Sequence, residues 1–256
     1  LIWALLQREP SLRSFDLIVM AHLLAGGLAI AGLGHRRRWT IAGTVLAASI
    51  FMLGGAASAR LNHAGMIVCY GLFPVALLSL EVALARRSLL LSVAFALVAA
   101  MIALGRNQVA LMLCLLLAGM ALRELVMTVH APGELRQRIV LLAVMGLVGL
   151  AVIAVPVLLS LQLAALSNRP EIGLATALEG SLHPSNLASL VAANVFGAHE
   201  PGFAYWGPNY ETMPEVAATD DSFNYLFAGS ASIIAVLWLG VGAGGVARRG
   251  CRSLTV

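Results

Sequence analysis

Five polar side chains of this sequence lie inside or beside apolar runs, where they could hold an anionic group. His22 falls within an apolar run, Arg60 and His63 share a short polar segment, and a later segment holds Arg106 and Gln108. Arginine can bind phosphate through two parallel N–H groups, and histidine can donate a hydrogen bond to it or titrate beside it. If the three segments meet, they would suit a phosphate or pyrophosphate that is attached to a lipid.

A simpler interpretation of these residues needs no ligand. An arginine beside an apolar run can extend its charged end to water while its aliphatic part stays among apolar groups. His22 could bond to a neighbouring helix. It is still the strongest of the five, because an ionisable side chain within a membrane span is costly.

A second set of polar residues lies between residues 160 and 225. Asp220 and Asp221 could bind a divalent cation or act as acid and base. The acidic and histidine residues upstream of them are His199, Glu200, Glu211 and Glu215. Their spacing is irregular, so the alternative is a hydrated loop in which an Asp caps the following helix. No phosphate-binding glycine loop, dinucleotide fingerprint, nucleophile elbow or cysteine-based metal spacing is present, and no cofactor is identified.

The elements that must position these residues are apolar helices. Hydrophobic residues make up 60% of the 256 positions and charged residues 11%, whereas soluble domains have about 25% charged residues. The apolar runs are about 17 to 22 residues long, enough to cross a hydrocarbon core of about 30 Å. We therefore predict an all-α integral membrane protein with about seven transmembrane helices. The expected spans are 16–34, 39–58, 66–84, 88–104, 108–122, 139–159 and 226–246.

Three regions follow from these spans: a six-helix transmembrane region at 1–159, a loop at 160–225, and a last transmembrane helix with a basic tail at 226–256. Glycines within the spans predict close helix packing. They are Gly26, Gly27 and Gly32, Gly54 with Gly55, and Gly146 with Gly149.

The arginines predict the orientation of the spans. Eleven of the 16 lie on the side of residues 36–38 if the connections alternate between the two membrane faces. Cytoplasmic loops collect positive charge, so we expect the C-terminus in the cytoplasm and the 160–225 loop outside. The net charge of +4 follows from this arrangement and does not indicate nucleic-acid binding. The use of Arg without Lys suggests a bacterial genome rich in GC, and hence the bacterial inner (cytoplasmic) membrane.

The third expected span contains two polar interruptions, Pro74 and Glu81. Membrane helices tolerate proline because neighbouring groups can bond the carbonyl that it frees. Glu81 could be a buried functional carboxylate, but Arg86 and Arg87 follow it closely. We therefore expect an ion pair between Glu81 and these arginines at the end of the span.

The loop at 160–225 is longer than the usual helix connection of about 2 to 8 residues. Residues 185–196 place apolar side chains on one helical face, with Ser185 as a potential N-cap and Gly197 as a stop. We expect an interfacial helix there, lying on the membrane surface. An aromatic turn region that includes Tyr205 and Trp206 follows it at the level of the headgroups.

Short motifs along the chain are similar, in the same order, to elements of the bacterial YfhO membrane-protein family, a branch of the GT-C glycosyltransferase class. The earlier ones are His22-Leu23-Leu24-Ala25-Gly26, Asn62-His63, Phe73-Pro74 and Gly105-Arg106-Asn107-Gln108. The later ones are Ser167-Asn168-Arg169, Ser181-Leu182-His183-Pro184-Ser185-Asn186-Leu187, Asn194-Val195-Phe196-Gly197 and Tyr205-Trp206-Gly207-Pro208. The chain departs from the family at 105–108, where Gly-His-Pro-Gln is frequent, and at His183-Pro184, where paired prolines are frequent.

The resemblance implies transfer of a sugar from a polyprenyl-phosphate donor to a cell-envelope polymer or glycolipid on the extracytoplasmic side. The implied phosphate ligands are His22, Arg60, His63, Arg106 and Gln108, and the implied sugar or acceptor cleft contains Asn186, Tyr205, Trp206, Asp220 and Asp221. GT-C enzymes generally carry the catalytic carboxylate in the first extracytoplasmic loop, and we expect this chain to be a fragment that starts beyond it. No catalytic residue is therefore assigned, and Asp16 is not given that role.

Two other functions would use the same outer polar groups. One is a transporter or flippase of a lipid-linked substrate, although the spans show no inverted repeat and no matching pair of broken helices. The other is a non-catalytic membrane scaffold that presents the long loop to a partner.

Overall fold

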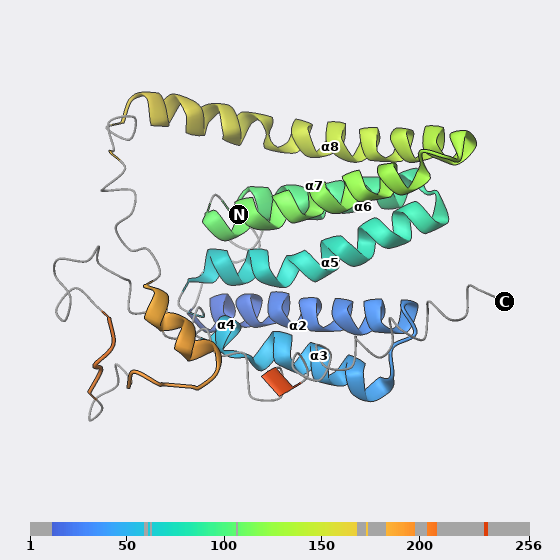
Figure 1. Ribbon diagram of the computed structural model, residues 1–256. Helices are drawn as coiled ribbons and strands as arrows, with labels where there is room; N and C mark the ends of the chain where they lie inside the picture. Colours follow the sequence, from blue (N-terminus) through green and yellow to red (C-terminus); the bar gives the residue numbers. More distant parts are fainter. Residues whose placement is uncertain are drawn as a thin grey trace. The chain divides into compact units, whose positions relative to one another are not determined.

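The computed structural model describes residues 12–58, 61, 63–105, 107–167, 173, 183–197, 204–208 and 233–234. All regular structure in these residues is helical, as predicted (Figure 1). The chain forms two compact units, one of residues 1–52 with 60–171 and the other of residues 53–59 with 172–256.

The first unit is a bundle of apolar helices, and each of the first six expected spans falls on one of them. The helices are α2 (Leu12–Arg36), α3 (Ile41–Leu53), α5 (Ala64–Arg86), α6 (Leu89–Ala103), α7 (Gln108–Thr128) and α8 (Pro132–Ala165). The seventh expected span, 226–246, lies outside the described residues.

Within the described residues, α2, α5, α7 and α8 are long and apolar enough to cross a membrane, by length and composition. At 13 and 15 residues, α3 and α6 would extend about 20 and 23 Å, less than a hydrocarbon core of about 30 Å. The bundle thus has the character of an integral membrane protein, while the topology of seven spans stays a prediction.

Helix α8 is longer than predicted. It begins at Pro132 instead of 139 and ends at Ala165 instead of 159. The sequence interpretation placed the charged residues Glu134, Arg136 and Arg138 in a loop. Proline at the first helical position and an acidic residue in the first turn both favour a helix start, and the charges lie on the polar first turns of the helix.

Helix α5 lies at the centre of the bundle. It packs against α2 on one side and against α6, α7 and α8 on the other, and in Figure 1 it runs between α2 and these helices. Its buried residues lie on more than one face, as contact with helices on both sides requires, and many of them join the neighbouring helices in one continuous apolar core. This core includes Leu72, Ala76, Leu80 and Ala83 of α5, Phe95 and Ile102 of α6, Leu117 of α7, and Leu141 and Met145 of α8.

The close approach of α2 to α5 depends on glycine. A Cβ atom on Gly26 would come within 2.6 Å of the Gly71 carbonyl oxygen and of the Phe51 ring. A Cβ atom on Gly71 would in turn meet the backbone of His22. Small residues at a helix crossing let two backbones approach closely in a membrane, so the close packing predicted for Gly26 and Gly27 is confirmed here.

An aromatic pair beside this glycine crossing holds α3 against α5. The rings of Phe51 and Tyr70 stack with centroids 4.2 Å apart and an interplanar angle of 6°. The Tyr70 hydroxyl also donates a hydrogen bond to the Phe51 carbonyl oxygen at 3.0 Å. A buried tyrosine hydroxyl needs such a partner, and this one ties the end of α3 to α5.

Short connections set the two ends of the bundle. Arg87 and Ser88 link α5 to α6, with Arg87 in the left-handed region at φ 52° and Ser88 as the N-cap of α6. Links this short make successive helices antiparallel. The turns at 37–40, 87–88 and 129–131 therefore lie at one end, called here the arginine-rich end, and the link at 104–107 lies at the opposite end with the start of α5.

In the second unit, the described residues form α4 (Gly55–Ser58), the 3₁₀ helix η2 (Pro184–Leu190) and the turns around it. A helix does form where one was expected at 185–196, but it is a short 3₁₀ helix that ends at Leu190. The N-cap of η2 is His183 instead of Ser185, and Asn194 in the left-handed region at φ 50° prevents a helix from reaching Phe196. Pro184 at the first position fixes the entry of the chain into this short helix.

The glycine crossing gives a direct test of the bundle. Substitution of Gly71 by Ala would force the added methyl against the His22 backbone, which cannot rotate away. We expect the variant to lose about 1 to 3 kcal/mol of stability, measured by thermal unfolding of the purified protein in detergent micelles. Gly119→Ala is the matched control, because a Cβ atom there meets nothing within 4 Å. If the two variants had the same unfolding midpoint, the α2–α5 contact would be wrong.

Candidate functional site

The link between α6 and α7 is built around the Asn107 side chain. Its Oδ1 accepts a hydrogen bond from the Ala110 backbone N–H at 2.8 Å, and its Nδ2 donates to the Gly105 carbonyl oxygen at 3.2 Å. Asparagine is a preferred N-cap because its side chain satisfies a free N–H of the first turn. Gln108, the first residue of α7, is exposed.

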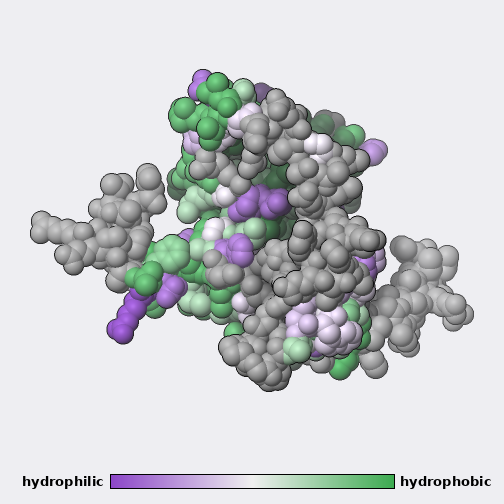
Figure 2. Space-filling model, turned by 90° about the vertical axis from the view of Figure 1, so that its left-hand side faces the viewer, coloured by the Kyte–Doolittle hydropathy of each residue, from purple (hydrophilic) through white to green (hydrophobic). Residues whose placement is uncertain are grey.

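This link packs against the first turns of α5. The Cys69 thiol donates to the Ile102 carbonyl oxygen at 3.5 Å, and Asn107 Nδ2 lies 4.0 Å from the Cys69 sulfur. His63 immediately precedes α5 as its N-cap residue and is exposed, although its side chain does not cap the helix. The structure therefore brings the segments of His63 and Gln108 to the same end of the bundle, as the sequence hypothesis requires. Figure 2 looks onto this side and shows hydrophilic residues among hydrophobic ones.

His22 lies elsewhere. It is on α2 at the glycine crossing, half-buried, and its Nδ1 is 2.7 Å from the carbonyl oxygen of Ile18 in its own helix. It thus bonds to its own helix, whereas the ligand-free interpretation expected a bond to a neighbouring one. Its level is that of Gly71, eight residues into the bundle from His63, or about 12 Å along the helix axis.

The remaining members of the predicted phosphate site and part of the predicted cleft cannot be placed. Arg60, Arg106, Asp220 and Asp221 lie outside the described residues. Within the described residues, no group of three His, Cys, Asp or Glu side chains could hold a metal ion. The acidic residues considered for a divalent cation are not among them.

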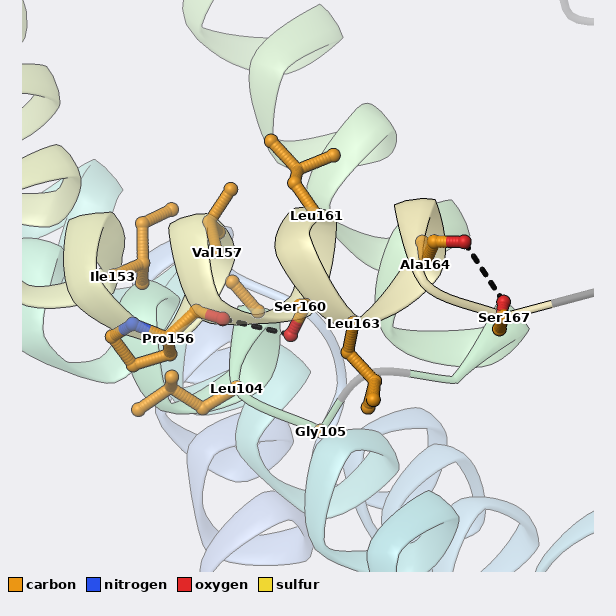
Figure 3. A pocket seen from close by; sticks show the side chains of 11 residues that line it. Leu104, Gly105, Ile153, Pro156, Val157, Ser160, Leu161, Leu163, Ala164 and Ser167 are labelled. Atoms are coloured by element: carbon orange, nitrogen blue, oxygen red, sulfur yellow. Dashed lines mark hydrogen bonds between the residues drawn. The ribbon is translucent and has the colours of Figure 1, made fainter. Parts of the chain in front are cut away.

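An apolar groove opens beside the α6–α7 link, and nothing in the sequence analysis anticipated it. Its volume is about 840 Å³, and it lies between the end of α6 and the last turns of α8 (Figure 3). The lining residues are Ala103, Leu104, Gly105, Ile153, Pro156, Val157, Ser160, Leu161, Leu163, Ala164 and Ser167. The two hydroxyls bond within α8, from Ser160 to the Pro156 carbonyl oxygen at 2.7 Å and from Ser167 to the Ala164 carbonyl oxygen at 2.8 Å.

A second apolar pocket of about 380 Å³, open to the surface, adjoins this groove. It lies between α6, α7 and α8 and shares Ala103 and Ile153 with the groove. Gly146 and Gly149 line it instead of making close helix contacts: a Cβ atom on Gly146 would meet nothing within 4 Å, and one on Gly149 only the Ala96 oxygen at 3.9 Å. The close packing predicted for this pair is therefore wrong at Gly146, which is exposed, whereas Gly149 lies at ordinary contact distance from α6.

One residue of the predicted sugar or acceptor cleft, Asn186, has unusual surroundings within the second unit. Asn186 is fully buried, and neither its side-chain nitrogen nor its oxygen has a hydrogen-bond partner. Ser189 donates to its backbone oxygen at 2.6 Å, which leaves the amide group unsatisfied. A buried polar group without a partner costs about 1 to 3 kcal/mol, so water or a polar ligand at this amide would be favourable.

The aromatic turn beside it is ordered by its own contacts. Trp206 is 62% exposed and makes an edge-to-face contact with Phe196, with ring centroids 5.2 Å apart. Its backbone N–H donates to the Phe196 carbonyl oxygen at 2.9 Å. The Tyr205 hydroxyl donates to the Pro208 carbonyl oxygen at 2.9 Å. The indole therefore presents an open, fixed aromatic surface.

Together these features define a helical membrane protein with an apolar groove that runs from one end into the bundle. Comparisons with known protein families, curated proteins and solved structures find no match. The relation to YfhO-like proteins therefore stays a hypothesis from the motifs.

The N-cap at the α6–α7 link can be tested by substitution. Asn107→Ala removes the acceptor for the Ala110 N–H and should lower stability by about 1 kcal/mol, measured by thermal unfolding in micelles. Asn107→Asp keeps an oxygen acceptor at the same place and should retain most of the stability. Equal losses in the two variants would show that the cap does not hold this corner.

Proposed function

We propose that this protein binds a lipid-linked sugar phosphate, with the hydrocarbon chain of the lipid in the groove between α6 and α8. We further propose that the protein takes part in transfer of the sugar. The observation that carries the proposal is that two apolar grooves adjoin, because both are lined by Ala103 and Ile153. A lipid chain could lie along adjoining apolar grooves of this kind, whereas a soluble substrate has no need of them.

The groove would orient the hydrocarbon chain of the lipid but would contribute little to its binding free energy. Lipid tails are already in an apolar medium, so moving one between helices gains little hydrophobic free energy. Affinity must therefore come from the polar head. The polar head would therefore bind at the end of the groove at Gly105, beside the link that holds Asn107 and Gln108.

In this proposal Arg60, His63, Arg106 and Gln108 hold the donor phosphate at that end. Two of them, His63 and Gln108, belong to segments that lie together in the bundle. His22 is not used, because α2 packs on the other side of α5 from the groove. Cationic and N–H groups around the phosphate would stabilise the negative charge that develops as it leaves, which is the main electrostatic need of this reaction.

The proposed chemistry is a substitution at the anomeric carbon of the sugar. The bond from that carbon to the phosphate oxygen breaks, the acceptor hydroxyl oxygen forms the new bond, and its proton passes to a base. That base is not assigned to any described residue. The acceptor class is a cell-envelope glycan or glycolipid, and the reaction would take place on the extracytoplasmic side.

We assign acceptor or sugar binding to the second unit. The exposed face of Trp206 suits the apolar face of a sugar ring. Asn186 is fully buried in this structure and would support this surface from within. Tyr205 would support this surface through its bond to Pro208.

Filling the groove should block lipid binding. The double variant Val157→Trp with Ala164→Trp places two indoles on the groove side of α8. We expect photocrosslinking to a polyprenyl-phosphate analogue to fall at least about tenfold, equivalent to about 1.4 kcal/mol.

The matched control is Val155→Trp with Leu158→Trp, on the same helix at positions that are 64% and 60% exposed and do not line the groove. Crosslinking of this control should match that of the wild type. Equal crosslinking in both double variants would place the lipid elsewhere.

Removal of the phosphate ligands should stop the transfer reaction. Alanine at Arg60, His63 and Arg106 should lower the rate of sugar transfer from a polyprenyl-phosphate donor at least about a hundredfold, as loss of electrostatic stabilisation of a transition state does. Arg13→Ala, an exposed arginine in the first turn of α2, is the control and should leave the rate unchanged. An unchanged rate in the triple variant contradicts the proposed site. Movement of the donor across proteoliposomes without covalent change would favour a flippase instead.

A further inference from the structure

A second pocket lies at the arginine-rich end, away from the groove and its link. It has a volume of about 240 Å³ and is bordered by the last turns of α2, α5 and α7 and the first turns of α8. Its floor is one face of α5, formed by Leu77, Leu80 and Leu84, because residues spaced by three or four positions share a helix face. At about 30 Å³ per water molecule, the pocket has room for a phosphate group.

Each of two glutamates in this pocket is bound by two arginines. Glu81 of α5 pairs with Arg37 and lies 3.8 Å from the Nε of Arg36. This corrects the expected pairing of Glu81 with Arg86 and Arg87. Residues five or six positions apart do not face each other on a helix, so the carboxylate turns to α2 instead.

The second glutamate, Glu124 of α7, repeats the arrangement. It lies 3.2 Å from Nη1 of Arg123 in its own helix and 3.2 Å from Nη1 of Arg138 in α8. The Arg138 and Glu124 side chains are 23% and 31% exposed, so these groups lie at the edge of the protein interior. The pairs tie α7 to α8 as the first set ties α2 to α5.

The pocket carries more positive charge than its carboxylates neutralise. Four arginines and two glutamates line it, an excess of two positive charges. A guanidinium has five N–H donors, and the bonds to the carboxylates use only part of them. One arginine per glutamate would be enough for an ion pair. The second arginine at each glutamate adds repulsion between like charges, which an anion in the pocket would remove.

We propose that this pocket binds the phosphate group of an anionic phospholipid from the membrane leaflet at the arginine-rich end. The arginines offer the charge-assisted hydrogen bonds that phosphate prefers. The leucine floor offers an apolar surface to the glycerol and the first carbons of the acyl chains. Basic pockets between membrane helices bind anionic headgroups in this way. The site is independent of the proposed sugar-phosphate groove, since it uses other residues at the other end of the bundle.

The test compares lipids and two matched variants of the full chain. Purified protein in detergent micelles is titrated with phosphatidylglycerol or phosphatidylcholine, and binding is read from native mass spectrometry and from the shift in the unfolding midpoint. Arg36→Gln with Arg138→Gln removes one arginine from each glutamate and leaves each carboxylate one partner. Arg86→Gln with Arg136→Gln removes the same charge at the same end, from positions outside the pocket.

The wild type should bind phosphatidylglycerol at least about tenfold more tightly than phosphatidylcholine, as a charge-assisted contact requires. The pocket variant should lose this preference, and the control variant should keep it to within about twofold, as expected for exposed charges. The proposal is overturned if the wild type shows no preference or if both variants lose it equally.

Two further arms complete the experiment. If the glutamine variant does not fold, Arg36→Lys with Arg138→Lys keeps the charge but loses the paired donors of the guanidinium, and should weaken the preference where Arg86→Lys with Arg136→Lys does not. Inorganic phosphate tests the source of the ligand. Weak or no displacement of the lipid by millimolar phosphate supports the lipid as the ligand. Full displacement would show that the pocket binds a soluble phosphate instead.

Discussion

Each backbone N–H and C=O group within a membrane must find its partner inside the chain, and this constraint explains most of the bundle. It makes every described apolar segment of the first unit a helix, and it moves polar side chains to the helix ends. Even the prolines within the spans obey it. Pro156 lies inside α8, and one turn later the Ser160 hydroxyl donates to its carbonyl oxygen, so this polar side chain is satisfied within its own helix.

The central helix divides the bundle into a tight side and a loose side. Toward α2, Gly26 and Gly71 bring two backbones together, and Phe51 stacks on Tyr70 beside them. Toward α8, small residues such as Gly146 face empty volume. These residues line an open apolar groove on the surface of the bundle, not a packed helix crossing.

The sequence predicts the helices well because hydrophobicity and length decide them before any tertiary contact forms. It also offers local signals for their ends, such as Asn107 and Ser88, which act as N-caps in the structure. It fails where a residue's role depends on a distant neighbour. Gly26 and Gly146 look alike in the sequence, yet one lies at a helix crossing and the other lines a cavity. Glu81 is close to Arg86 in sequence, yet it pairs with Arg37, 44 residues away.

The two ends of the bundle are held in different ways. At the arginine-rich end, ion pairs through Glu81 and Glu124 join α2 to α5 and α7 to α8. At the opposite end, the polar groups are satisfied mainly within the α6–α7 link, and the last turns of α8 border the groove. None of residues 146–165 of α8 is buried, so its C-terminal half has few buried contacts to lose. Local opening costs least where buried contacts are fewest. A lipid entering sideways from the membrane would therefore separate α8 from α6 at this end, while the ion pairs keep the other end closed.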